Sequence, residues 1–324
     1  MKSNQFVLNS NLIDLKAITI SEGAAGMRSQ IEGLANLICN SHQNFDVQIK
    51  PFFRNLPIQL IPASAKAYQN IDQIKIQSKV LVISCGKKSV KASIYLKKKF
   101  KGLVFNIHIQ DPKSNHNLFD LIISPEHDQL KKPNSISSLL ALHNINFDLN
   151  KKKTNSINFI IGGSNKYFKF NEDTQNKILN DLEFLSEISF VNVIPSRRTP
   201  SEFIKNLSIL KKHNIKLFTD LFDPVTYGNL LSESNIQIVT WDSISMISEA
   251  ISSETGTFLY EFEEESCPKR YQLFHQMVKQ KGFIKSFSRN MEPYTVSMSS
   301  YNSELKSKIL NKIESNLWFK NSVS

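Results

Sequence analysis

The chain has 324 residues, of which 40% are hydrophobic and 10% aromatic, so it can bury a sizeable core and is not expected to be disordered. This length predicts two domains of about 150 residues each. The cysteines, Cys39, Cys85 and Cys267, are odd in number and lack CxxC spacing, which favours a reducing compartment and no cysteine-based zinc site.

The net charge of +11 comes from 40 Lys and Arg against 29 Asp and Glu. A basic protein attracts anionic lipid, phosphorylated substrates or nucleic acid. Lys, Asn, Ile and Phe are all abundant, as in AT-rich genomes, so we assign most of the charge to composition and keep peripheral contact with an anionic membrane as an alternative. We expect no nucleic-acid partner.

No hydrophobic run approaches the ~18 residues that span a bilayer, and the N-terminus lacks the apolar core of a signal peptide. We therefore expect a cytoplasmic protein, with a peripheral position at the inner membrane left open.

Strands and helices are predicted to alternate through the first half of the chain. A strand at 17–21 leads through a glycine-containing turn into a helix over 27–40, whose apolar residues recur at helical spacing. The turn does not complete GxGxxG, so no dinucleotide fingerprint is supported. The other predicted elements are a helix at 89–99 and strands at 47–50, 80–84, 103–109 and 119–123, with the Pro-rich segment after residue 50 unassigned.

The polar, basic segment 151–155 precedes a new strand, and we place the boundary there, between domains 1–150 and 151–324. A terminal helix could pack back on the first domain. Beyond the boundary we expect an acidic turn at 261–265, strands at 157–161, 189–194, 215–218 and 236–239, and helices at 171–186, 200–212, from 223, from 243, at 268–281 and at 301–319.

This alternation implies parallel sheets with right-handed crossovers. The predicted fold class is α/β, with two doubly wound Rossmann-like domains facing a cleft.

Two loops of the second half have features of phosphate sites. Gly162-Gly163-Ser164 follows a strand, and glycines allow backbone N–H groups to approach a ligand. In Ser196–Pro200, Arg197 and Arg198 offer forked donors that suit phosphate, although adjacent arginines are commonly solvated. Thr199 and Glu202 have the spacing of a capping box, with Pro200 at the first helical position.

A third loop, Thr240–Ala250, follows the strand at 236–239. Ser243 or Asp242 could cap the helix that starts here, and Asp242, Met246 (or Ser245) and Glu249 share one helical face. The partial positive charge of a helix N-terminus favours phosphate. An ordinary capped helix with a solvated Glu249 explains this stretch equally well.

These loops resemble a known family. Ser196–Pro200 and Asp242–Ala250, with Pro125–Asp128 and residues 23–35, look like the bacterial and plant proteins named for the mitochondrial fission factor "elongated mitochondria". The resemblance spans roughly residues 20–260. That family is similar to glycosyltransferases of the GT-B type, and its bacterial members are usually described as glycosyltransferases. Its plant member is an adaptor that recruits a dynamin-like protein to mitochondria.

The resemblance implies a nucleotide-sugar donor on the second domain and a cell-envelope lipid or saccharide acceptor on the first. It implies sugar transfer with the nucleotide-sugar as substrate and no cofactor, and we expect no metal because no carboxylate-histidine cluster has ligand spacing. The alternative is a non-catalytic adaptor with a vestigial nucleotide site. The donor site would comprise Gly162, Gly163, Ser164, Ser196, Arg197, Arg198, Thr199, Asp242, Ser243, Met246 and Glu249.

Within this site, Arg197 and Arg198 are predicted to bind the donor phosphates, and Glu249 the ribose hydroxyls while it stays hydrated in the free protein. His127, oriented by Asp128, is predicted to be the general base, because imidazole titrates near neutrality and its loop ends a first-domain strand. A lone histidine in a turn is more often structural.

Overall fold

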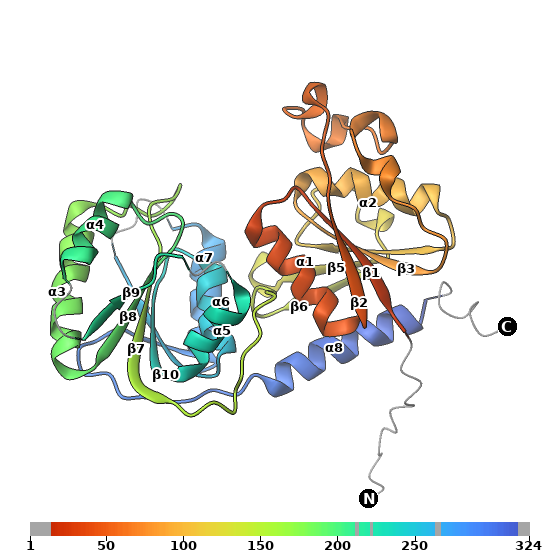
Figure 1. Ribbon diagram of the computed structural model, residues 1–324. Coiled ribbons are helices and arrows are strands. Elements are labelled where there is room, and N and C mark those ends of the chain that lie inside the picture. The colour runs from red at the N-terminus through yellow and green to blue at the C-terminus, as the bar shows by residue number, and fades with distance from the viewer. Residues whose placement is uncertain (1–13, 211–213, 221–222, 263–266, 317–324) are drawn as a thin grey trace, which may run out of the picture.

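The computed structural model contains two six-stranded sheets (Figure 1). Every neighbouring pair of strands in them is parallel. It describes residues 14–210, 214–220, 223–262 and 267–316. In Figure 1 the first domain lies at the right and the second at the left. Within the described residues, no helix combines the length and apolar character needed to cross a membrane.

The first sheet has the strand order β2-β1-β3-β4-β5-β6. Its strands are β1 (Lys16–Ser21), β2 (Ser41–Asp46), β3 (Val80–Cys85), β4 (Val104–Ile109), β5 (Leu121–Pro125) and β6 (Ser135–Ser138), and its helices are α1 (Ala25–Ile38) and α2 (Lys87–Lys99). The strand predicted at 47–50 is wrong. The true strand, β2, is the polar stretch SHQNFD at the sheet edge, where backbone pairing with β1 outweighs the missing apolar pattern.

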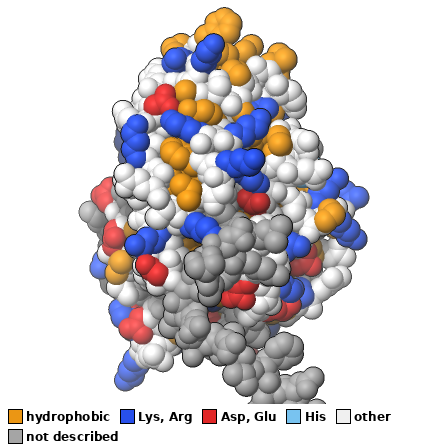
Figure 2. Space-filling model, turned by 90° about the vertical axis from the view of Figure 1, so that its right-hand side faces the viewer, with side chains coloured by type: hydrophobic (Ala, Val, Ile, Leu, Met, Phe, Trp, Pro, Cys, Tyr) orange, Lys and Arg blue, Asp and Glu red, His pale blue; other side chains and the backbone are white. Residues whose placement is uncertain are grey.

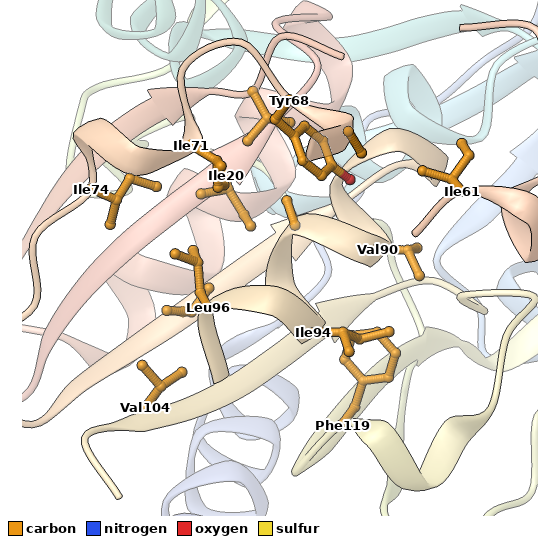
Figure 3. Close-up of a cluster of buried hydrophobic side chains, with 14 of the residues drawn as sticks. Ile20, Ile61, Tyr68, Ile71, Ile74, Val90, Ile94, Leu96, Val104 and Phe119 are labelled. Carbon is orange, nitrogen blue, oxygen red and sulfur yellow. The ribbon is translucent and has the colours of Figure 1, made fainter. Parts of the chain in front are cut away.

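A lobe that we define as residues 50–74 replaces a crossover helix between β2 and β3. It consists of short 3₁₀ turns at Pro51–Phe53, Ile58–Leu60, Ala65–Ala67 and Ile71–Gln73. Figure 3 shows how its side chains Ile61, Tyr68 and Ile71 pack together with Val90 and Leu96 of α2. The lobe is therefore anchored to the core of the first domain.

The second sheet has the order β12-β11-β10-β7-β8-β9. Its strands are β7 (Thr154–Ile161), β8 (Phe190–Pro195), β9 (Ile215–Leu217), β10 (Ser234–Thr240), β11 (Gly256–Tyr260) and β12 (Ile284–Ser286). Its helices are α3 (Glu172–Ile188), α4 (Ser201–Ile209), α5 (Pro224–Glu233), α6 (Ile244–Ser252) and α7 (Lys269–Gln280). The order reverses between β7 and β10, and open α/β sheets bind ligands beyond the carboxyl ends of the strands at such a point.

Most elements predicted in this half are present, but β11 and β12, like β6 in the first half, were not predicted. Parts of the predicted helix 200–212, of the acidic turn 261–265 and of the helix 301–319 lie outside the described residues.

Helix α8 (Ser299–Glu314) connects the end of the second domain to the first. Figure 1 shows it, in blue, running from the second domain to below the first. Ile309 and Ile313 are buried in the cluster that contains Ile31 and Leu34 of α1. The segment between the sheets joins the domains too, since Leu139 and Leu140 belong to a core cluster of the second domain. The boundary at residue 150 stays a prediction.

Two glycines of α1 differ in their surroundings and give a test of how closely this connecting segment packs. A Cβ atom at Gly33 would collide with the backbone of His143, whereas nothing lies within 4 Å of one at Gly26. We expect Gly33→Ala to destabilise the fold by about 1–3 kcal/mol. Gly26→Ala should stabilise it by up to about 1 kcal/mol, because alanine favours helix. Thermal unfolding measures both, and equal effects would contradict the packing.

Candidate functional site

A cleft of about 440 Å³ lies between the two domains, where the loops at the carboxyl ends of both sheets meet. The polar side chains of the first domain in its wall are Gln30, Gln110, His127 and Asp128. Those of the second domain are Asn165, Lys166, Tyr167, Arg198, Asp242, Ser243, Ser245, Arg270 and Tyr271. The cleft therefore unites both predicted catalytic residues with part of the predicted donor site.

The Asp242 carboxylate organises the second-domain wall. Its side chain is fully buried and forms an ion pair with Arg198, whose Nη2 lies 2.6 Å from Oδ2. It also accepts hydrogen bonds from the Thr240 hydroxyl at 2.7 Å and from the Gly163 N–H at 3.2 Å. A buried carboxylate is tolerated when it is paired and hydrogen-bonded in this way. Asp242 thus joins the loops that follow β7, β8 and β10.

The sequence predicted that the glycine pair presents free N–H groups to a ligand. In the structure the pair serves this packing, and its N–H groups are bound within the protein. A Cβ atom at Gly162 would collide with the Asp242 carboxylate, and one at Gly163 with the backbone of Arg198. The Gly162 N–H donates to Thr240 Oγ1 at 2.8 Å, and the Gly163 N–H to Asp242. Both glycines are needed because the loops approach each other too closely for any side chain.

The predicted capping box at Thr199 is wrong. The Thr199 hydroxyl donates to the carbonyls of Ile161 and Gly162, at 2.9 and 2.6 Å, and it accepts from the Ser196 N–H at 2.9 Å. Helix α4 begins after Pro200 without a side-chain cap. A buried hydroxyl must find hydrogen-bond partners, and the carbonyls of Ile161 and Gly162 supply them here.

The two arginines have different environments. Arg198 is held by Asp242, with its side chain 35% exposed toward the cleft, so it is not the free phosphate ligand that was predicted. Arg197 is exposed and does not belong to the cleft wall.

The remaining predicted donor residues support the loops or stand at the edge of the cleft. Of the two predicted caps of α6, Ser243 and Asp242, it is Ser243 that accepts a hydrogen bond from the Met246 N–H. Met246 packs against a core cluster. Ser164 accepts from the Phe170 N–H at 3.0 Å and Ser196 from the Arg198 N–H at 3.2 Å. Of this group only Ser243 belongs to the cleft wall.

His127 belongs to the cleft wall and also packs between the domains. It is 6% exposed, and its ring meets the Phe274 ring of α7 edge-on at 5.5 Å. Nδ1 has no hydrogen-bond partner, and Nε2 lies 3.8 Å from Asp128 Oδ1, beyond hydrogen-bond distance. Burial lowers the pKa of His127, Arg270 lowers it further, and Asp128 opposes them. The imidazole is therefore neutral near pH 7 and able to accept a proton.

Several cleft residues were missed by sequence reasoning. Lys166 lies two residues after Ser164, in the loop that begins with the two glycines. Its closeness to them in the sequence could have identified it as a cleft residue. Arg270 is the second residue of α7, and its guanidinium carbon lies 5.2 Å from the Tyr271 ring and 5.8 Å from the Tyr167 ring. Nothing in the sequence indicates that α7 reaches the cleft, because this depends on how the domains pack.

The arrangement agrees with the comparison to known proteins. The family described as "Mitochondrial fission ELM1" matches residues 25–308. The chain belongs to this family. It is 27% identical to "Uncharacterized protein RP120" of Rickettsia prowazekii over 321 residues, 81% of this chain and 88% of that protein. It is 23% identical to "Mitochondrial fission protein ELM1" of Arabidopsis thaliana over 246 residues, 64% of this chain and 57% of that protein.

A solved structure supports the fold. A UDP-N-acetylglucosamine 2-epimerase matches with a TM-score of 0.51 and 12% identity, over 94% of this chain and 97% of that one. The predicted fold class is thereby confirmed: this ELM1-family chain has two Rossmann-like domains of the GT-B-like type.

Glu249 of this ELM1-family chain lies outside the cleft wall and is half-buried, so it is less hydrated than expected. Burial raises the pKa of Glu249 to about 8, against the lowering effects of a hydrogen bond with Tyr227 and of the Arg197 charge. An acid that is protonated in the folded state and shares a hydrogen bond with a neighbouring helix has the features of a structural contact.

The two adjacent arginines test the role of the Asp242 ion pair. Arg198→Ala would leave the Asp242 carboxylate buried without a cation, so we expect a loss of about 3 kcal/mol in the free energy of unfolding. Arg197→Ala, the matched control, should cost less than about 1 kcal/mol, because this side chain is exposed. Chemical denaturation compares the variants, and similar losses from both would remove the ion pair as the organising contact.

Glu249 predicts a pH-dependent stability. Its ordinary pKa is 4.5 and its folded pKa about 8, so between these values the folded state holds a proton that the unfolded state has lost. Wild-type stability should therefore fall relative to Glu249→Gln as pH rises from 5 to 8, by up to about 1.4 kcal/mol per pH unit.

Melting curves of both proteins across this pH range measure the difference. Glu187→Gln, which changes an exposed glutamate on α3, is the control. A constant difference between Glu249→Gln and wild type would refute the raised pKa.

Proposed function

We propose that the chain transfers a sugar from a nucleotide-sugar donor to a cell-envelope lipid or saccharide acceptor in the interdomain cleft. The observation that carries this proposal is the composition of the cleft walls. The second domain contributes the cations Lys166 and Arg270, and the first contributes a neutral, partly unpartnered His127. Glycosyl transfer needs both an anion site for the leaving diphosphate and a proton acceptor.

The donor phosphates would lie at the N-terminus of α6. Ser243, Ile244 and Ser245 all belong to the cleft wall, so the positive end of this helix faces the cavity. Lys166 and Arg270 are exposed beside it and take the role first assigned to the arginine pair. These charges stabilise the negative charge that develops on the diphosphate as it leaves.

His127 would act on the acceptor. Its neutral imidazole takes the proton of the acceptor hydroxyl, the oxygen forms the new bond to the anomeric carbon, and the bond from that carbon to the diphosphate breaks. Asp128 stabilises the imidazolium that results, since the carboxylate raises the pKa of His127. His127 and Asp128 need no role beyond this proton transfer.

A non-catalytic adaptor is the second candidate, and one observation favours it. The N–H groups of Gly162 and Gly163 and the guanidinium of Arg198 are already bound to protein partners. An adaptor would retain such internal contacts for the stability of the loops without binding a nucleotide.

Ligand binding separates these candidates. In a thermal-shift screen against UDP, GDP, CMP and their sugars, a true donor at about 100 times its Kd should stabilise the fold by ~2.7 kcal/mol. Lys166→Ala and Arg270→Ala should each weaken that binding about tenfold, whereas Lys205→Ala on α4, outside the cleft, should not. If no nucleotide shifts the melting temperature, the adaptor is favoured.

With a donor in hand, His127→Ala should abolish transfer and leave donor affinity within a factor of about two, or ~0.4 kcal/mol. His127→Gln, whose side chain is closer in volume to histidine, controls for a loss of activity caused by disturbed packing on Phe274. Retained turnover in both variants would remove His127 from the mechanism, and lost donor affinity would move it to the binding site.

A further inference from the structure

The lobe carries the two most exposed large hydrophobic side chains of the described residues. Phe52 is 79% exposed and Leu60 is 65% exposed, on two successive 3₁₀ turns. Their neighbours point inward: Ile58 and Ile61 are buried in the first-domain core. Because the core fixes these turns, Phe52 and Leu60 are held outward and cannot be covered by a simple rotation of the lobe.

The same lobe is positively charged. Lys50, Arg54 and Lys66 are exposed, and Asp72, the single acidic residue in the sequence of the lobe, pairs with Lys99 of α2. In the part of the chain that the structure describes, no carboxylate forms an ion pair with these three cations. Figure 2 shows hydrophobic side chains at the top of the molecule with Lys and Arg beside them.

We propose that the lobe docks on an anionic lipid surface, with Phe52 and Leu60 entering the interface and Lys50, Arg54 and Lys66 facing the head groups. Stable peripheral binding needs two signals, and the lobe combines apolar side chains with cations. The centres of protein–protein interfaces are depleted of lysine, and the lobe projects from the molecule (Figure 1). Both features favour a lipid surface.

The lobe is connected to the first sheet in such a way that docking on a membrane would also orient the cleft. The lobe follows the carboxyl end of β2, and the loop with His127 follows the carboxyl end of β5 in the same parallel sheet. Both therefore lie at one edge of the first domain, so a docked chain would present its acceptor-side loops toward the bilayer. The docking itself does not depend on sugar transfer and would equally serve an adaptor.

Co-sedimentation of the full chain with vesicles tests the proposal. We expect binding to vesicles of phosphatidylcholine and phosphatidylglycerol in equal parts, and much weaker binding to phosphatidylcholine alone. Each cation near an anionic surface changes affinity about fivefold, so the triple variant Lys50→Gln/Arg54→Gln/Lys66→Gln should bind about a hundredfold more weakly. Phe52→Ser/Leu60→Ser should lose at least tenfold, with an unchanged melting temperature because both side chains are exposed.

Matched controls are available on the second domain. Ile188→Ser/Val225→Ser removes two side chains that are 58% and 54% exposed, and it should leave binding unchanged. Lys152→Gln/Lys205→Gln/Lys269→Gln removes the same number of exposed charges and should cost much less than the lobe triple variant.

Three results would overturn the proposal. They are failure to bind anionic vesicles, equal binding to neutral ones, and equal losses from the lobe variants and their controls. A self-association seen by ultracentrifugation without lipid, and lost in Phe52→Ser/Leu60→Ser, would instead identify the lobe as a contact between copies of this chain.

Discussion

The buried Asp242 carboxylate is the contact on which the second-domain wall of the cleft depends. It binds the cation that follows β8, an N–H group that follows β7 and the hydroxyl that ends β10. Because an unpaired buried carboxylate is very unfavourable, none of these loops can move away without a large free-energy cost. The wall is therefore formed before any ligand arrives, and the two glycines are the steric condition for it.

The opposite wall depends on packing between the domains. The turn Glu126–Asp128 lies against α7, where His127 meets Phe274, and α8 and the segment around Leu139 join the two domains elsewhere. The environment that makes His127 neutral is thus produced jointly by a loop of one domain and a helix of the other. Any motion that opens the cleft would expose this imidazole to water and raise its pKa toward the ordinary value.

The positive charge of the chain has at least two distinct locations. In the cleft, Lys166 and Arg270 lie beside the N-terminus of α6, where they suit a small anion. On the lobe, Lys50, Arg54 and Lys66 surround exposed apolar side chains, which suits an extended anionic surface. Composition alone cannot separate these roles, because net charge carries no information about position.

The sequence by itself determined the elements and the class of fold. Apolar periodicity and capping residues such as Asp223 and Ser243 act over a few residues, so the positions of most helices and buried strands follow from local patterns. The same locality explains the errors: β2 is a strand because β1 pairs with it, and β11 and β12 were not predicted from the local sequence. Only the tertiary structure decided that Arg198 pairs with Asp242, that Glu249 is half-buried beside Tyr227, and that Arg270 reaches the cleft. Each of these depends on groups that are distant in the chain and adjacent in space, and a single sequence does not encode such distances in any local pattern.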